Sequence, residues 1–133
     1  MARDQVVSAR YAVGVGARSE FGAEDLSALV RETALRFDVA LAGATLAALK
    51  SHENVAGFAQ AAEQLGMRLA LFSAEELPRA GLLTHSQRIE RLYGVGSLAE
   101  ALALAAAGEG ASLLAPRVAT LRLTCAVAKG GHR

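Results

Sequence analysis

Short apolar segments alternate with amphipathic segments of helical period, and this alternation restricts the fold more than any other feature of the sequence. Apolar runs at residues 11–16, 44–49 and 68–72 are each bounded by glycine or polar residues. Between them, apolar side chains recur every three or four positions, as in a helix with one buried face. Strands that alternate with helices need crossover connections, which place the strands parallel. The sequence therefore predicts an α/β domain with a parallel core.

The remaining elements follow from capping patterns and period-two alternation. Ser73 and Ser97 each precede a glutamate by three positions, the pattern of a capping box at a helix start. Leu121, Cys125 and their apolar neighbours alternate with Arg122 and Thr124, which indicates a strand with one apolar face. We expect helices at 23–37, 54–65, 86–93 and 97–108, a short helix from Ser73, and strands at 112–115 and 120–128.

These elements predict one compact α/β domain over residues 1–133, with its core at about 11–128. We expect a mixed, mostly parallel sheet of about five strands flanked by helices. The last two strands are adjacent in sequence, so they should close the sheet as an antiparallel C-terminal β-hairpin at its edge. The strand order in the sheet is not determined by the sequence.

Charge and composition exclude several classes of partner. The 14 Lys and Arg residues against 13 Asp and Glu residues leave a net charge of +1, which argues against nucleic acid and against a charged membrane surface. The chain has no Trp for base stacking. No run approaches the 18 or so apolar residues that a membrane helix needs, and the start Met1-Ala-Arg-Asp-Gln5 does not look like a signal peptide. We expect a cytoplasmic protein.

Metal and cofactor sites are not indicated by the sequence. Cys125 is the single cysteine, which excludes an intrachain disulfide and a cysteine-cluster metal site. His52, His85 and His132 lie far apart and show no zinc-binding spacing. Cys125 lies among apolar strand residues and is expected to be a small buried side chain rather than a nucleophile. We predict no metal and no cofactor.

Polar clusters follow the predicted strands, and ligands bind beyond the carboxyl ends of strands in an open parallel sheet. Gly14 and Gly16 end the first strand and would let the backbone approach a phosphate, or would simply permit a tight turn. A dinucleotide-binding pattern would need glycine at Ser19 and an acidic residue where Lys50 stands. That mismatch argues against a dinucleotide.

The second cluster, Lys50-Ser51-His52-Glu53, concentrates a cation, a hydroxyl, an imidazole and a carboxylate. It is compatible with acid–base chemistry, with His52 and Glu53 as the catalytic candidates. It is more typical of a solvated loop in which Ser51 or Asn54 caps the next helix. Both interpretations stay open on residue types alone.

Two arginines and two further polar residues complete the candidate site. Arg18 and Arg117 each follow a strand end, where they would bind carboxylates or lie exposed on the surface. Ser73 is explained by helix capping, whereas Glu75 is not and could face the cleft. Residue chemistry alone therefore predicts a small α/β domain with a polar cleft.

Five sequence blocks, in order and with matching spacing, carry a family resemblance over about residues 11–128. They are Gly14-Val15-Gly16-Ala17-Arg18; Leu49-Lys50-Ser51-His52-Glu53; Phe72-Ser73-Ala74-Glu75-Glu76-Leu77; Ser86 followed by Gly94-Val95-Gly96-Ser97-Leu98-Ala99-Glu100-Ala101; and Pro116-Arg117 followed by Thr124-Cys125-Ala126-Val127-Ala128. With these blocks the chain resembles the CobE/CbiG C-terminal domain family of cobalamin (vitamin B12) biosynthesis. Ala17 stands where the family often has Cys, and Arg117 where it usually has Lys.

The resemblance implies a role in building the corrin ring and a corrin or precorrin pathway intermediate as ligand. The longer relatives are associated with opening a ring-derived lactone, and this chain looks like the stand-alone form of the cobalt-late, oxygen-dependent route. Corrin intermediates are wide apolar rings rimmed by carboxylates, which basic residues at strand ends would bind. The candidate substrate-binding residues are Gly14, Gly16, Ala17, Arg18, Lys50, Ser51, His52, Glu53, Ser73, Glu75, Arg117 and Thr124.

Three functions remain open at this point. The first is a binding module that holds or hands over a pathway intermediate without making bonds. The second is a hydrolase-like enzyme for a lactone or ring-edge acetyl group, with His52 or Glu53 as general base and Lys50 or Arg18 stabilising the oxyanion. The third is a structural partner of corrin-pathway methyltransferases or other cobalamin-biosynthesis enzymes.

Overall fold

The computed structural model describes residues 10–18 and 20–131. The described elements, in chain order, are β2 (Tyr11–Ala17), α1 (Ala23–Phe37), β3 (Thr45–Leu49), α2 (Val55–Leu65), β4 (Arg68–Phe72), the single 3₁₀ turn η1 (Ala74–Glu76), α3 (Gln87–Tyr93), α4 (Leu98–Ala107), β5 (Ser112–Leu113), β6 (Val118–Ala119) and β7 (Leu123–Lys129). Three sequence expectations fall outside the described residues: the start of the chain, Ser19 and His132.

One mixed sheet of six strands organises the domain, in the order β4-β3-β2-β7-β5, with β6 also paired to β7. Strands β2, β3 and β4 are parallel, and β7 runs antiparallel to β2 along seven residue pairs, from Tyr11 with Lys129 to Ala17 with Leu123. Strands β5 and β6 both pair antiparallel with β7. The predicted α/β class, its parallel core and its C-terminal hairpin are confirmed.

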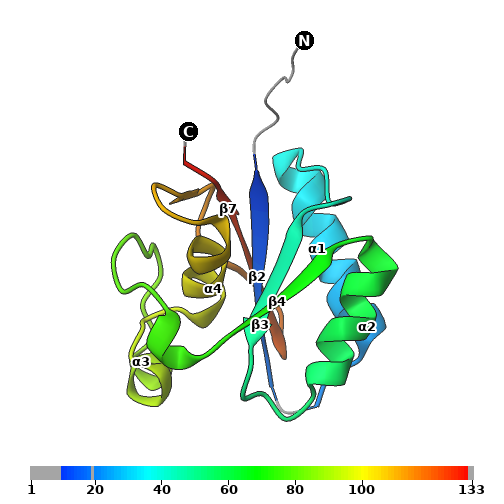
Figure 1. Cartoon of the computed structure of the whole chain (residues 1–133). Helices are drawn as coiled ribbons and strands as arrows, with labels where there is room; N and C mark the ends of the chain where they lie inside the picture. Colours follow the sequence, from blue (N-terminus) through cyan, green and yellow to red (C-terminus); the bar gives the residue numbers. More distant parts are fainter. Residues whose placement is uncertain (1–9, 19, 132–133) are drawn as a thin grey trace.

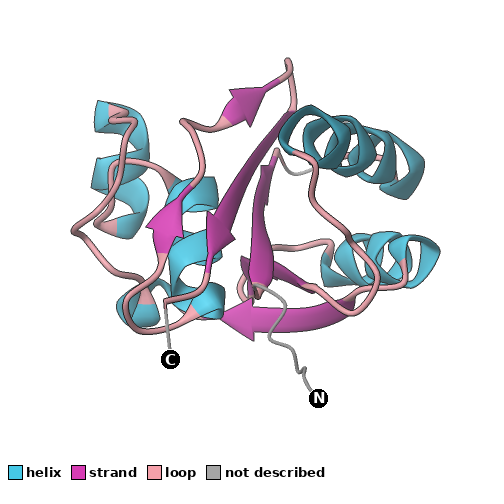
Figure 2. Ribbon diagram, turned by 90° about the horizontal axis from the view of Figure 1, so that it is seen from above, coloured by secondary structure: helices cyan, strands magenta, loops and turns pink. Residues whose placement is uncertain are grey.

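Helices cover both faces of this sheet (Figures 1 and 2). On one face α1 and α2 pack against the sheet over a core that includes Leu26, Val30 and Phe58. On the other face α4 packs across β2, β3 and β7. Helix α3 places Ile89 and Tyr93 against an apolar cluster that Leu98 and Leu102 of α4 share with the end of β3. None of the described helices is long and apolar enough to cross a membrane.

Helix α4 approaches the sheet closely because its packing residues are small. Its residues Leu98–Leu104 are all buried and, apart from Glu100, are leucine or alanine. A Cβ atom added at Gly14 of β2 would lie 2.1 Å from the Ala99 carbonyl oxygen and 2.4 Å from the Ala103 nitrogen. Gly14 therefore serves the contact between strand and helix, where no larger residue fits.

The C-terminal strands differ from the sequence prediction in extent and place. The predicted strand 112–115 shortens to two residues, and the predicted strand 120–128 begins only at Leu123. Leu121 lies before that strand and is 87% exposed, so its assignment to the apolar face was wrong. Strand β7 is interior rather than at the edge, because β2 pairs on one side of it and β5 and β6 on the other. Helices α1 and α4 cover its two faces, so Ala126 and Ala128 are as buried as Cys125 and Val127.

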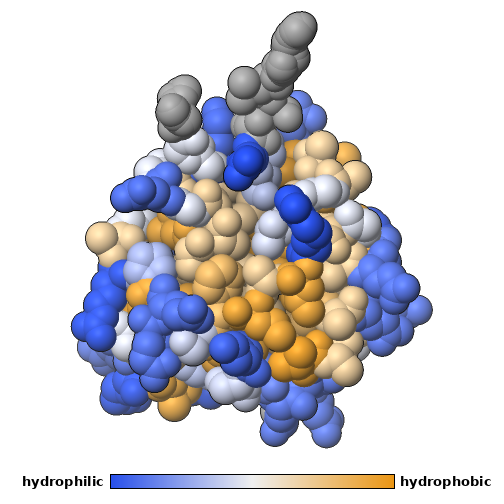
Figure 3. All heavy atoms as spheres, viewed as in Figure 1, coloured by the Kyte–Doolittle hydropathy of each residue, from blue (hydrophilic) through white to orange (hydrophobic). Residues whose placement is uncertain are grey.

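Strand β4 forms the opposite edge of the sheet. Its residues from Leu69 to Phe72 are partly buried. In the surface view of Figure 3, hydrophobic atoms gather across the middle of this face and charged residues surround them. At the carboxyl ends of the parallel strands, Leu49 of β3 still pairs with Phe72 of β4, whereas Ala17 of β2 pairs with Leu123 of β7. The cavity described next is formed at the carboxyl ends of β2 and β3.

Candidate functional site

A cavity of about 620 Å³ opens at the carboxyl ends of β2 and β3. Four segments line it: the end of β2 at residues 16–18, the loop at 51–53, helix α3 with Leu98, and the segment 117–124 that leads into β7. The walls are joined by the Arg18 amide, which donates to the Arg122 carbonyl oxygen at 3.0 Å, and by the Thr124 hydroxyl, which donates to the Gly16 carbonyl oxygen at 3.5 Å. This position agrees with the expectation that ligands bind beyond strand carboxyl ends.

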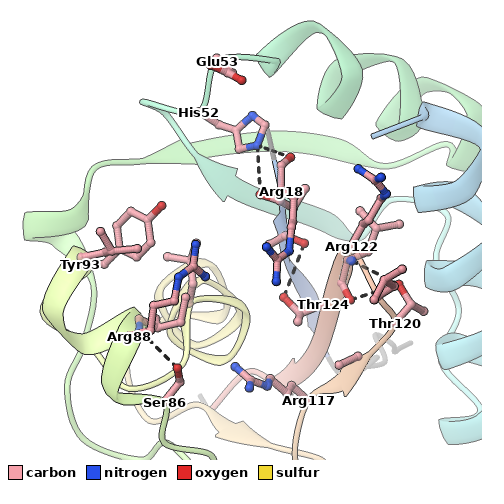
Figure 4. A pocket seen from close by; sticks show the side chains of 18 of the residues that line it. Arg18, His52, Glu53, Ser86, Arg88, Tyr93, Arg117, Thr120, Arg122 and Thr124 are labelled. Atoms are coloured by element: carbon pink, nitrogen blue, oxygen red, sulfur yellow. Dashed lines mark hydrogen bonds between the residues drawn. The ribbon is translucent and has the colours of Figure 1, made fainter. Parts of the chain in front are cut away.

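Positive charge is concentrated in this cavity. The described lining residues include one carboxylate, that of Glu53, and four arginines: Arg18, Arg88, Arg117 and Arg122. No carboxylate of the described chain lies within ion-pair distance of these four guanidinium groups. Arg18, Arg88 and Arg117 point into the open space from three sides, and Arg122 turns toward its outer side (Figure 4). Because the whole chain carries only +1, this local excess favours an anionic ligand.

The same cavity also has an apolar wall. Ile89, Leu92 and Tyr93 of α3 line it, as does Leu121 on the turn before β7. Leu92 is 57% exposed and Leu121 is 87% exposed. Together these two side chains expose a large apolar area to solvent for a small domain. The cavity therefore suits a ligand that combines an apolar body with negatively charged groups.

His52 lines the cavity, but both of its ring nitrogens are already used. Its Nδ1 accepts a hydrogen bond from the Asn54 amide at 2.9 Å, so the ring proton lies on Nε2. Nε2 then donates to the carbonyl oxygens of Ala17 and Arg18, each at 3.1 Å. The ring also packs edge-on against Phe21 and Phe58. His52 thus ties the loop after β3 to the end of β2, and it has no free lone pair with which to take a proton.

A buried carboxylate behind the cavity holds two of its walls. Glu100 of α4 is fully buried, and its Oε1 accepts from the amides of Leu83 and Thr84 at 2.8 and 2.9 Å. Its Oε2 accepts from the Thr84 hydroxyl at 2.6 Å and from the Arg117 amide at 2.9 Å. Burial raises the pKa of Glu100, but the donors outweigh burial, the Thr84 hydroxyl first and then the amides, so the pKa is lowered.

The second predicted capping box, Ser97 with Glu100, is only half formed. The Ser97 hydroxyl does accept from the Glu100 amide at 3.4 Å, as an N-cap should. The Glu100 side chain, however, does not return to the Ser97 amide, because it is bound to the loop residues instead. At the first box, by contrast, the Glu76 carboxylate does accept from the Ser73 amide at 2.7 Å, over a single 3₁₀ turn.

The structure brings together eight of the twelve predicted site residues and leaves four outside the cavity. The eight that line it are Gly16, Ala17, Arg18, Ser51, His52, Glu53, Arg117 and Thr124. Lys50 is exposed beside Glu76, whose pKa it helps to lower, and it lies beyond the cavity lining. Ser73 and Glu75 follow the edge strand β4, and Gly14 packs against α4.

Helix α3 and the turn before β7 are the parts of the cavity that the residue patterns did not indicate. Arg88 and Tyr93 come from α3, and Thr120 and Arg122 come from the turn. The sequence predicted α3 and its Ser86 cap, which accepts from the Ile89 amide at 3.3 Å, but not where the helix lies in space. The one available indication was Leu92 near Arg88 and Arg91, an apolar residue on a short helix that carries two arginines.

Cys125, the single cysteine of the chain, does not line this cavity. Cys125 lies in the middle of β7 and is fully buried, as predicted. Burial raises the pKa of its thiol to about 12. Within residues 10–18 and 20–131, no three His, Cys, Asp or Glu side chains come close enough to hold a metal ion.

Comparison with known proteins identifies the family. Residues 11–128 match the model of the family described as the C-terminus of cobalamin synthesis protein G. The chain belongs to this CbiG C-terminal family. The match spans every strand of the sheet apart from the last residue of β7, and it contains the whole cavity. The resemblance predicted from the five sequence blocks is thereby confirmed.

Solved structures agree with this assignment. The chain is 30% identical to CobE, a protein from the cobalamin (vitamin B12) biosynthetic pathway, with 92% of each chain covered and a TM-score of 0.84. It is also 30% identical to the cobalamin biosynthesis protein chiG from Agrobacterium tumefaciens strain C58, over 92% of this chain and 99% of that one, with a TM-score of 0.69. No curated protein sequence matches the chain. The chain is therefore a member of a family of cobalamin biosynthesis proteins.

Proposed function

We propose that this CbiG-family domain binds a corrin-ring intermediate of cobalamin biosynthesis in the cavity and hands it on without making or breaking bonds. The observation that carries the proposal is the excess of arginine over carboxylate in the cavity, beside an apolar wall. Precorrin intermediates combine a wide apolar ring with acetate and propionate groups at its rim. Arginine binds such carboxylates with two parallel hydrogen bonds, and apolar side chains pack against the ring.

The state of His52 supports binding over hydrolysis. A general base must accept a proton, and both His52 nitrogens are engaged by backbone groups. Glu53 is the one carboxylate among the described lining residues, and it is exposed. Lys50, the alternative oxyanion partner, lies outside the cavity lining. Of the four groups in the hydrolase-like alternative, His52 is engaged and Lys50 lies outside the lining, whereas Glu53 and Arg18 both line the cavity.

The test is a visible-absorbance titration of the purified protein with a metal-free precorrin, followed by gel filtration and mass analysis of the recovered ligand. We expect a stoichiometric complex, a shifted ligand spectrum and an unchanged ligand mass. A changed mass would replace the binding proposal with an enzymatic one, centred on Glu53. Absence of any complex would refute the ligand class and favour a role as protein partner.

Helix α3 offers a matched pair of variants for this titration. Arg88 lines the cavity, whereas Arg91 lies one turn along the same helix, is exposed, and does not. A charge-assisted hydrogen bond contributes about 1.5–3 kcal/mol, so Arg88→Ala should weaken binding by about tenfold or more. Arg91→Ala removes the same charge and helix contacts but should leave the affinity nearly unchanged. Equal effects of the two variants would indicate a diffuse attraction rather than the proposed cavity.

A further inference from the structure

The polar contacts behind the cavity converge on one side chain. Oε1 of Glu100 holds the segment that leads into α3, through the amides of Leu83 and Thr84. Oε2 holds the segment that leads into β6 through the amide of Arg117, and it also accepts from the Thr84 hydroxyl of the first segment. These two segments carry opposite walls of the cavity, the first with Arg88 and the second with Arg117. Little regular structure supports either of them, since residues 77–86 and 114–117 form neither helix nor strand.

We propose that Glu100 is the positioning residue of the ligand site, and that its two carboxylate oxygens set the separation of the walls that carry Arg88 and Arg117. The inference rests on the proposed function for its ligand but not for its geometry. Glu100 does not touch the cavity, since it is fully buried on α4, so it acts through the backbone of the two segments. The core helix α4 thereby fixes the placement of two arginines that come from distant parts of the sequence.

A carboxylate is required here because every group that faces it is a donor. Three backbone amides have no lone pair to offer, and the Thr84 hydroxyl alone is able to reverse its role. In Glu100→Gln, the amide NH₂ takes the place of one oxygen. The less costly orientation keeps oxygen at Oε1 for Leu83 and Thr84 and places NH₂ at Oε2, where the hydroxyl can turn to accept. The Arg117 amide is then left facing a donor.

This asymmetry gives a specific prediction for amide hydrogen exchange. In Glu100→Gln the Arg117 amide should exchange at least tenfold faster than in the native protein, while the Leu83 and Thr84 amides keep most of their protection. In Glu100→Ala all three amides should lose protection. Equal protection of the Arg117 amide in the native protein and in Glu100→Gln would overturn the proposal, whatever the ligand is.

Ligand affinity provides the second readout. Glu100→Gln should bind the metal-free precorrin about tenfold more weakly at a temperature where it is fully folded. The matched control is Val30→Ala, which truncates a buried residue of α1 on the other face of the sheet and lowers stability without touching the cavity walls. A purely structural role for Glu100 predicts that both variants lose stability and keep their affinity, which would overturn the positioning role. If the native protein fails to bind, the function proposed above is wrong, but the exchange measurement still decides whether Glu100 holds the two walls.

Discussion

Replacement of Gly14 by alanine tests the closest contact in the fold. The added Cβ would lie 2.1 Å from the Ala99 carbonyl oxygen, more than about 1 Å inside the ordinary carbon–oxygen contact of about 3.3 Å. The second close atom is the Ala103 nitrogen, which also belongs to the backbone. No side-chain rotation can relieve the overlap, so α4 has to move away from β2 along its whole buried face.

The cost should exceed that of an ordinary overpacked core. Extra methyl groups in cores typically cost about 1–3 kcal/mol, mostly where flexible side chains can yield. Because both close atoms at Gly14 are backbone, we expect Gly14→Ala to lower the free energy of unfolding by at least about 3 kcal/mol. For a chain of 133 residues this corresponds to a fall in Tm of roughly 10 °C. Urea unfolding and thermal unfolding, both followed by circular dichroism, measure the two quantities.

Two further variants make the measurement decisive. Gly22→Ala is the control, because a Cβ there meets nothing closer than 3.5 Å and the backbone has a φ of −95° that alanine adopts readily. It should change stability by less than about 1 kcal/mol. Leu102→Ala should not rescue Gly14→Ala, since the overlap is with backbone. A loss below about 1 kcal/mol for Gly14→Ala, or unchanged stability with lost ligand binding, would refute the packing role and restore a ligand role for this glycine.

Two other predictions concern titrating groups. The hydrogen bond from the Ser73 amide lowers the pKa of Glu76 from 4.5, so its ionised form contributes stability that is lost as the pH falls below 4.5 through the lowered pKa. Glu76→Gln should therefore lose less stability than the native protein between pH 6 and pH 3 (the range is about that of the carboxylate transition), and identical pH profiles would contradict this. Burial raises the pKa of the Cys125 thiol to about 12, so a thiol reagent at about pH 8 should label the native protein only as fast as it unfolds. Rapid labelling before unfolding would show that β7 is not the buried strand described above.

Local patterns predicted the elements because their causes are local. The Asn54 side chain caps α2 by accepting from the Gly57 amide, and Gly66 and Gly94 end their helices in left-handed conformations, at positions that the sequence marks directly. The alternation of strands and helices likewise limited the fold to an α/β domain with a parallel core. These features depend on residues within one or two turns of each other, so a single sequence is enough to specify them.

The site could be predicted only in part, because its completion depends on contacts between distant segments. Arg18, Glu53 and their neighbours follow strands whose ends must meet in a parallel sheet, so topology alone placed them together. Arg88 is brought to the cavity because Ile89 and Tyr93 of α3 pack against a cluster formed by distant segments, which no local pattern encodes. Glu100 matches a capping box, yet the loop amides offered it a fuller set of donors than the helix start. Long-range competition for hydrogen bonds decided that outcome.

The interior place of β7 has a consequence for how the domain acquires its structure. The strand paired with β2 along its full length is the last strand of the domain to be synthesised, while β2 is the first of the described strands. Until β7 emerges, the unit from β2 to β4 has an open edge at β2, and α4 lacks part of the surface on which it packs. Closing the sheet joins segments separated by nearly the whole chain, a connection that is entropically costly and slow to form. The domain should therefore fold after its translation is complete, and a nascent chain that stops before β7 should remain susceptible to proteases.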